Sequence, residues 1–566
     1  MIKSRENSEI SRRHFMTLAG GAAGMAAMAS MGIPTGWAAN DPEVDTENMK
    51  YQEEETDILV VGGGIAGLFA AVKGHDAGAR VLMVSKGRLG ASGQTPWARA
   101  VHGYDSEKKD LYGHPHPSLD ELVNAVSQSA LETNNPVYTR LMMEHSLARV
   151  NELREWGFFE SPLYANAFNK PIQERNIPLM ERVMIASLIK ENGRIAGAAG
   201  FSMDEEKLYV IKAKTVILCT GAGGFKPNGW PICDLTHDGT IMAYDIGAKV
   251  TGKEWNDGHG GRGEHPADCF DDGESSFSSA PFAIDFELQH DLGADQHYLT
   301  YKTGNFVTGE EVTGGPYRPS IREELKNPGR GGGSPGRPRS GVRIGGASAG
   351  MAIHKAEGLV PINDKCESNI PGLYAAGDAL GSSTVGGIYA QGASAMAGSS
   401  VEGTIAAETA AEYCKGIDMP SISSKKIGEV KEKILAPLKR EAGYGPAWVT
   451  QTLQGIMIPS FVLYIKKESI LKAALAYMEE LRDHHLPMLK AADMHELRLA
   501  HETANMIISA EMKLRASLMR KESRVSHYRL DYPDVDDVNW RAWINIYKGS
   551  DGSMQLEKQP WDQWPA

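Results

Sequence analysis

Cysteine is scarce in this chain, and its spacing excludes several classes of redox and metal site. Five cysteines stand among 566 residues, and no two of them have C-x-x-C spacing. A scattered, odd-numbered set predicts neither a disulfide framework, nor a structural zinc site, nor an iron–sulfur cluster. The sequence also lacks C-x-x-C-H, the attachment motif of c-type haem. We therefore expect no metal site and no built-in electron carrier of these kinds.

The chain also has fewer basic than acidic residues. The chain has 59 Lys and Arg against 72 Asp and Glu, a formal net charge of −13. This balance argues against nucleic acid or an anionic membrane as a partner. Glycine is abundant instead, at 62 residues, where about 7% is usual, which predicts tight turns and close backbone approaches. The length predicts more than one domain.

The N-terminal segment has the pattern of an export signal. The stretch "SRRHFM" (11–16) carries twin arginines, and the apolar run "TLAGGAAGMAAMASMGI" follows it. The small residues of "GWA" then predict a cut after Ala38. Residues 1–38 therefore resemble a twin-arginine signal of a bacterial protein exported in the folded state with its cofactor. The apolar run is too short and too weakly hydrophobic for a stable membrane span, so we expect a periplasmic or otherwise extracytoplasmic protein.

Residues 57–87, "DILVVGGGIAGLFAAVKGHDAGARVLMVSKG", predict a strand, a glycine turn, a helix and a second strand. The turn has G-x-G-x-x-G spacing between two apolar runs, which allows the backbone to approach a pyrophosphate at the helix N-terminus. The second strand ends at a serine, where dinucleotide-binding folds often have Asp or Glu for the ribose hydroxyls. The cofactor contacts predicted here are Gly62, Gly64, Ile65, Ala66, Gly67, Ser85 and Lys86.

Two further apolar runs end in glycine or acidic residues. They are "KTVILCTGAGGF" (214–225) and "IPGLYAAGDAL" (370–380), the second of which contains Asp378. A dinucleotide site assembled from segments this far apart fits FAD better than NAD. The neutral stretch 379–401 comes next, without a charged side chain and bounded by Asp378 and Glu402. We expect it to turn into a helix whose N-terminus faces the isoalloxazine, since its small residues allow close approach.

Composition changes twice more along the chain. Between 258 and 340, Gly, Pro, Arg and His increase, which predicts an inserted, loop-rich domain over the cofactor, with a solvated loop at 327–340. From about 425 the pattern becomes helical, and one helical face is expected from Ala500, Ala504, Ile507, Ile508, Leu514 and Leu518.

Several segments, in order along nearly all of the mature chain, resemble the fumarate reductase and succinate dehydrogenase flavoprotein family. They are "VVGGGIAGLFAA", "GRIAGAAGF", "TVILCTGAGG", "LTHDGTIMAYDIGAK", "IPGLYAAGD" and "MRKESRVSHYRLDYPDVDDVNW". "GLYAAGDALGSS" and "YRLDYPDVDD" are also similar to the adenylylsulfate reductase flavoprotein branch. The resemblance implies an α/β fold with a two-part Rossmann-like FAD domain (52–257 and 341–415), an inserted α+β capping domain (258–340) and a helical C-terminal domain (420–566).

The resemblance also implies how FAD is held. Membrane-bound relatives attach the flavin to a histidine in an R-S-H-T segment, whereas the matching run here is "GASGQTPW" (90–97), so we expect non-covalent FAD. Asp378 is expected to bind ribityl or ribose hydroxyls. The remaining expected cofactor contacts are Ala91, Ser92, Gly93, Thr220, Gly221, Asp238, Ala395 and Met396.

Candidate catalytic residues follow from the same comparison. "GKEWNDGH" (252–259) resembles the family's E-F-V-Q-Y-H segment, which puts His259 at a substrate-binding position, and "GGRGEHP" (260–266) resembles a loop that offers Arg262 and Glu264. His354 aligns with a second substrate histidine. The remaining candidates are Arg318, Arg322 and Tyr389. The two arginines also fit the start of a surface helix, and Arg262 with Glu264 also fits a structural ion pair.

One departure from the family decides the expected substrate. Fumarate-reducing relatives have an arginine in H-G-A-N-R-L-G-G-N-S, and our alignment puts Ala390 there, beside Tyr389. An alanine cannot bind a carboxylate, so fumarate is disfavoured. The expected reaction is hydride transfer from flavin N5 to the C=C bond of another unsaturated acid or enone, as a terminal respiratory step fed by a cytochrome or quinol-linked partner. Two alternatives stay open: dehydrogenation of a cyclic or steroid-like substrate, and an electron-transfer flavoprotein subunit.

Overall fold

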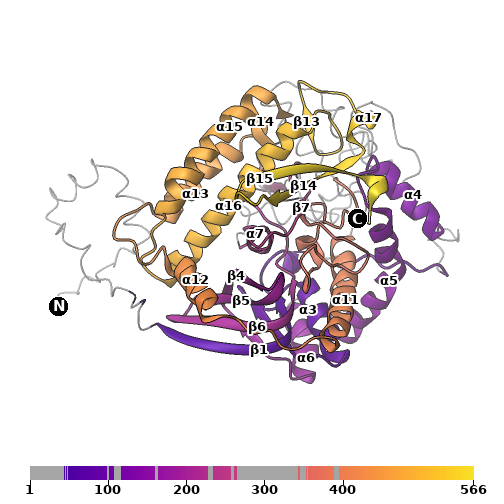
Figure 1. The fold of residues 1–566 in the computed structure, drawn as a ribbon. Coiled ribbons are helices and arrows are strands. Elements are labelled where there is room, and N and C mark those ends of the chain that lie inside the picture. The colour runs from indigo at the N-terminus through magenta and orange to yellow at the C-terminus, as the bar shows by residue number, and fades with distance from the viewer. Residues whose placement is uncertain are drawn as a thin grey trace, which may run out of the picture. The chain divides into compact units, whose positions relative to one another are not determined.

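The computed structural model describes residues 44, 46 and 49–565, apart from 98–100, 108–116, 160–163, 227–233, 257–260, 264–341, 345–351, 353–354, 388–393 and 464. All helices and strands discussed below belong to the compact unit Asn48–Ala566. Figure 1 shows this unit, with the central sheet below the C-terminal helices in that view.

The central sheet is built around a long strand, β1 (Lys50–Val61), whose apolar end Ile58–Val61 is buried. The strand order is β3-β2-β1-β6-β5-β4, and β11 pairs with β6. Strands β3, β2, β1, β6 and β11 run parallel, whereas β5 pairs antiparallel with both β6 and β4, so the sheet is mixed. The other bounds are β2 Val81–Ser85, β3 Leu179–Glu181, β4 Val183–Glu191, β5 Arg194–Ser202, β6 Lys207–Leu218 and β11 Leu373–Ala375.

The helix between the first two parallel strands packs closely against the helix of the neutral stretch. Helix α3 (Ile65–Asp76) contacts α11 (Ser394–Lys415), and α11 also contacts α5 (Pro136–Glu155). A Cβ at Gly403 of α11 would lie 2.4 Å from the carbonyl oxygen of Ala66, so only glycine permits this approach. The neutral stretch turns into a helix as predicted, since α11 begins at Ser394, and its small residues serve helix packing; that the helix N-terminus faces the flavin ring stays a prediction.

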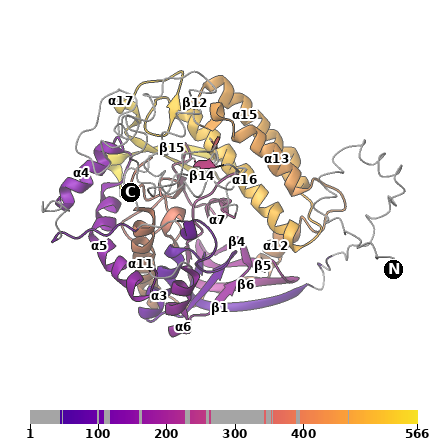
Figure 2. The same cartoon turned by 180° about the vertical axis from the view of Figure 1, so that it is seen from behind.

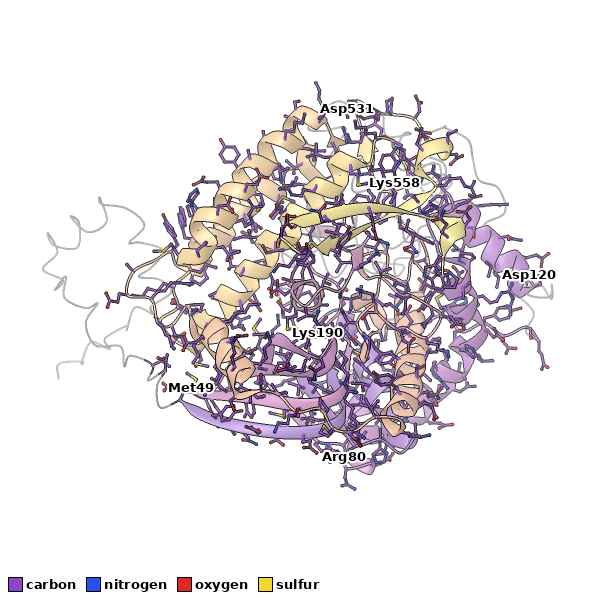
Figure 3. The ribbon with its side chains drawn as sticks, viewed as in Figure 1. Met49, Arg80, Asp120, Lys190, Asp531 and Lys558 are labelled. Carbon is purple, nitrogen blue, oxygen red and sulfur yellow. The ribbon has the colours of Figure 1, made fainter. Side chains whose placement is uncertain are left out.

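Helices α4 (Leu119–Ser129) and α5 begin at recognisable caps. Helix α4 starts with a capping box between Ser118 and Glu121, and α5 starts at Asn135 and Pro136. Charged side chains such as Arg80 and Asp120 lie on the outer surface, as Figure 3 shows. The other helices and short 3-10 turns of this part are η1 Thr95–Trp97, α6 Tyr164–Glu174, α7 Asp238–Asp245 and η4 Gly377–Ala379.

The C-terminal part is mainly helical, as predicted. Its longest helix is α16 (Met494–Met519), which α13 and α15 flank in both views (Figures 1 and 2). Of the face predicted for this helix, Ala500, Ile507 and Leu514 are buried in its core. The further bounds are α12 Ser424–Leu435, α13 Pro446–Met457, α14 Ser460–Leu463, α15 Glu468–Glu480, η5 Leu481–His485, η6 Leu486–Met488, α17 Asp537–Trp540 and η7 Trp561–Gln563.

A β-hairpin in this part was not predicted. Strands β14 (Ala542–Lys548) and β15 (Met554–Pro560) form it, and β14 pairs with β7 (Val250–Thr251) of the cofactor domain. Strand β10 (Gly358–Leu359) completes this four-stranded sheet. The short pairs are β8 (Gly261–Gly263) with β9 (Val342–Ile344) and β12 (Ile465–Lys466) with β13 (Tyr528–Arg529). Among the described residues, no helix is both long and apolar enough to cross a membrane.

Two helical glycines give a test of the glycine turn. A Cβ at Gly67 in α3 would lie 2.0 Å from the carbonyl oxygen of Gly62, whereas one at Gly428 in α12 would meet nothing within 4 Å. We expect Gly67→Ala to lower the free energy of unfolding by about 3 kcal/mol or more. Gly428→Ala should raise it by about 0.5–1 kcal/mol, since alanine favours helix. Urea unfolding of the two variants checks this, and an unchanged midpoint for Gly67→Ala would contradict the described packing.

Candidate functional site

A cavity opens at the carboxyl ends of the parallel strands, where ligands bind in open α/β sheets. It contains about 860 Å³ free of atoms, open solvent included. Its wall is drawn from segments far apart in sequence, after β1, after β2, after β6, at the start of α7 and around η4. Such a composite wall suits an elongated dinucleotide.

The glycine turn between β1 and α3 forms one side of this cavity. Gly62 has φ +123°, and a Cβ there would lie 2.1 Å from the carbonyl oxygen of Cys219 in the chain after β6. Gly64 precedes α3 without a side-chain cap, and the first helical N–H, that of Ile65, donates to Thr95 Oγ1 at 3.1 Å. The first turn of α3 therefore faces the cavity with backbone N–H groups, which fits a pyrophosphate.

Lys86, directly after β2, links this wall to the C-terminal part of the chain. Its Nζ lies 2.6 Å from Asp238 Oδ2 and 2.9 Å from Glu502 Oε1. Glu502 is fully buried on α16 and also pairs with Lys226 and Arg498. Burial alone would raise the pKa of Glu502, but the surrounding cations lower it to about 2. Lys86 and Asp238 were predicted as cofactor contacts, but their neighbour Glu502 was not. A single glutamate within a helix shows no sequence pattern that marks it as part of a site.

The carboxylate of Asp238, the first residue of α7, has a defined orientation. Its Oδ1 accepts hydrogen bonds from Thr236 Oγ1 and Asn505 Nδ2, each at 2.8 Å. Asp238 lines the cavity, as do Ser85, the last residue of β2, and Lys86, which follows it. These groups offer hydrogen-bond donors and acceptors for the polar parts of a dinucleotide.

Most predicted cofactor contacts line the cavity. They are Gly62, Gly64, Ile65, Ala66, Ser85, Lys86, Ser92, Gly93, Thr220, Gly221, Asp238 and Asp378. The other four lie elsewhere among the described residues. Gly67 packs behind the turn, Ala91 is exposed beside Arg182, and Ala395 and Met396 belong to the first turn of α11.

The candidate catalytic residues fall largely outside the described residues. His259, Glu264, Arg318, Arg322, His354, Tyr389 and Ala390 all do, and the structure leaves these predictions untested. Arg262 belongs to β8, where its backbone pairs with Arg343 of β9.

The structure does describe the chain that leads into two of these segments. The Asn256 N–H donates to Ser526 Oγ at 3.2 Å, and Ser526 Oγ donates to the Gly387 carbonyl oxygen. A Cβ at Gly387 would lie 2.6 Å from the ring of Trp255, so the two stretches are also in contact through that ring. The Ser526 hydroxyl thus links the chain directly before residues 257–260, which include His259, to the chain directly before residues 388–393, which include Tyr389.

A cluster of buried charges, missed by sequence reasoning, lies next to Asp238. Glu357 accepts from Lys253 at 2.5 Å and from Lys513 at 3.3 Å, and His237 Nδ1 lies 3.3 Å from the same carboxylate. Burial, helped by Lys253, lowers the pKa of His237 to about 4, so this imidazole is neutral at neutral pH. His237 has φ +63°, a conformation that the surrounding contacts must maintain. Within the described part of the chain, no group of three or more His, Cys, Asp and Glu residues is placed to hold a metal ion.

Two family models match the chain. The family described as fumarate reductase flavoprotein C-term matches residues 450–565, and the family described as FAD dependent oxidoreductase matches residues 57–226. The second match contains the glycine turn and the strands β1, β2 and β6.

Curated relatives match over most of their length. An uncharacterised FAD-dependent oxidoreductase of Methanocaldococcus jannaschii is 26% identical, covering 89% of this chain and 98% of the relative. A chain of the fumarate reductase (CoM/CoB) of Methanothermobacter marburgensis is 25% identical, with coverage of 86% and 96%. The L-aspartate oxidase of Streptomyces coelicolor is 24% identical, with coverage of 90% and 94%.

Solved structures share the fold. Adenylylsulfate reductase from Archaeoglobus fulgidus has a TM-score of 0.68 at 21% identity, over 91% of this chain and 97% of the other. The E. coli quinol fumarate reductase has a TM-score of 0.67 at 17% identity, over 90% and 97%. Both likenesses cover the cofactor domain and the C-terminal helical part described above.

The buried Lys86–Glu502 ion pair predicts how the stability of the protein changes as the pH is lowered. The difference between the ordinary carboxyl pKa of 4.5 and about 2 corresponds to about 3 kcal/mol of stability. Because the folded-state pKa is lowered, this contribution is complete above pH 4.5 and is lost as pH falls toward 2. Glu502→Gln should therefore be less stable than wild type at neutral pH, and the difference should shrink in acid. Urea unfolding across this pH range measures it. The exposed Glu408→Gln on α11 is the control, and a constant gap at all pH values would contradict the assignment.

The glycine turn, the composite cavity and the acidic and cationic groups around it fit a dinucleotide, and the matched sequence families bind the flavin form. The chain is an FAD-dependent oxidoreductase whose C-terminal part, residues 450–565, matches the fumarate reductase flavoprotein C-term family.

Proposed function

We propose that this protein is a periplasmic FAD-dependent reductase. It reduces the C=C bond of an unsaturated organic acid or enone other than fumarate, with electrons from an external cytochrome or quinol-linked protein. The observation that carries the proposal is a fumarate reductase-like scaffold whose neutral stretch, 379–401, has no charged side chain. The twin arginines Arg12 and Arg13 support export.

The reaction class is supported by the names of the relatives. Those relatives include fumarate reductases, which act on a C=C bond, and L-aspartate oxidases. This chain has the cavity for the cofactor, and its C-terminal part matches the fumarate reductase flavoprotein family. Both observations favour a reaction at the bound flavin, as in those relatives.

The substrate preference follows from charge. A dicarboxylate held in a water-poor site needs cationic partners, and arginine suits a carboxylate best because it can form two parallel hydrogen bonds. The stretch 379–401 offers no such cation at any position, so the argument does not depend on which residue aligns with the family's arginine. Its described residues 382–387 are buried and small, and the hydroxyls of Ser382 and Thr384 donate to Glu402. An uncharged or bulkier substrate is therefore favoured.

The chain's own groups have separate tasks in this proposal. FAD, when bound, supplies the hydride that reduces one carbon of the double bond. His259 and Arg262 polarise the electron-withdrawing group of the substrate, because cationic donors stabilise the charge that develops there. Tyr389 or Glu264 supplies the proton for the second carbon. His354 and Arg322 are further donors for substrate binding.

Non-covalent flavin is the first test. The run 90–97 contains no histidine that could bond to the flavin ring. Acid precipitation of the purified protein should therefore release all flavin absorbance into the supernatant. A fluorescent, yellow pellet after washing would show a covalent link and contradict this expectation.

Reoxidation of the photoreduced flavin tests the substrate class. Under anaerobic conditions, an enone or bulky enoate should reoxidise the flavin at least about tenfold faster than fumarate, because the missing cation penalises the dicarboxylate. Faster reaction with fumarate would overturn the proposal. Reoxidation only by a redox protein would favour an electron-transfer role, and flavin reduction by a saturated cyclic ketone would favour a dehydrogenase.

Two variants assign the roles in the same assay. His259→Ala should keep FAD and lower the reoxidation rate by about 100-fold. His145→Ala, an exposed histidine on α5, is the matched control and should react as wild type does. Full turnover in His259→Ala would remove this residue from the proposed site.

A further inference from the structure

Lys355 is a buried lysine held in an unusual backbone conformation. Its side chain has no exposed surface, and its φ is +61°. Residues other than glycine seldom adopt this conformation unless their surroundings maintain it. Here the Lys355 carbonyl oxygen accepts the N–H of Ser383 at 2.7 Å, so the neutral stretch itself helps to hold the lysine backbone.

The ammonium group of Lys355 lies between two carboxylates. Its Nζ is 3.0 Å from Glu402 Oε2 and 4.0 Å from Asp378 Oδ1, and it donates to Ser399 Oγ at 3.2 Å. The side chain reaches this place by crossing α11 at Gly398, where a Cβ would lie 2.5 Å from Lys355 Cε. Glycine at this position gives the lysine its path.

The two carboxylates have different surroundings. Glu402 is buried in protein and accepts hydrogen bonds from the Gly377 N–H, Ser382 and Thr384, in addition to Lys355. Asp378 and Ser399 instead line the cofactor cavity. Glu402 thus anchors the ammonium from behind, while the ammonium faces a carboxylate and a hydroxyl on the cavity wall.

We propose that Lys355 is a positioning residue for FAD, acting through Asp378. Its ammonium holds the Asp378 carboxylate in position on the cavity wall, where that carboxylate accepts hydrogen bonds from cofactor hydroxyl groups. Hydrogen bonds to an ionised acceptor are stronger than neutral ones, so the lysine raises FAD affinity without a direct contact. This inference rests on FAD as the cofactor and is independent of the proposed substrate and direction.

A double-mutant cycle on FAD affinity tests the proposal. The pair variant Lys355→Met with Glu402→Gln removes both fully buried charges together, so Glu402 is not left as a buried carboxylate without its lysine and the protein is expected to fold. It is compared with wild type, with Asp378→Asn, and with the triple variant. FAD release from each purified holoprotein on dilution, followed by flavin fluorescence, gives the dissociation constant.

The proposal requires an effect that depends on Asp378. The pair variant should weaken FAD binding by about tenfold when Asp378 is present and by less than about twofold when Asp378→Asn is present. Equal losses in both backgrounds would show a purely structural role, and no loss with Asp378 present would also overturn the proposal. Neither result depends on catalytic turnover, so failure here is distinct from failure of the proposed reaction.

Gly398→Ala gives a second, independent test that keeps every charge. The added methyl group would displace the lysine side chain from its path across α11, away from Asp378. FAD binding should weaken several-fold in this variant, again only while Asp378 is present. Wild-type affinity in Gly398→Ala would contradict the described route of the lysine. Circular dichroism of each variant verifies that the fold is intact.

Discussion

The ion pair between Lys86 and Glu502 is the interaction on which the described architecture depends. It joins two residues separated by 416 positions in sequence, one at the end of a cofactor-binding strand and one on the long C-terminal helix. Glu502 also pairs with Lys226 and Arg498, and Lys86 also pairs with Asp238. Removing one partner of such a buried group leaves uncompensated charge, which commonly costs about 3–5 kcal/mol. The cavity wall and the C-terminal helices therefore form one cooperative structure.

Charge is also concentrated behind the neutral stretch. Lys355 and Glu402 lie beneath its first residues, and the cluster of Lys253, Glu357 and Lys513 lies beside the start of α7. The stretch 379–401 itself contains no charged side chain, but charged side chains from other parts of the chain pack against it. The buried ion pairs maintain its backbone in place, since every charge in them needs its partner at a fixed distance.

Several features could be predicted from local pattern. The glycine turn, the end of β2 at Ser85 and the buried face of α16 were all found, because each depends on steric demands or on a periodicity visible within a short window. The hairpin β14–β15 was not found. The first strand is buried along most of its length and the second is rich in polar residues, so neither shows a clear alternation, and β14 is held by pairing with β7.

The sequence by itself determined the cofactor class and the order of the elements that bind it. Those properties depend on short-range rules: which residues permit a tight turn, which runs are apolar, and which chain ends present N–H groups to an anion. Only the tertiary structure decided which distant charges serve the cavity. Glu502, Glu357 and Lys355 acquire their roles from partners far away in sequence, and a buried charge is defined by the neighbours that compensate it in space.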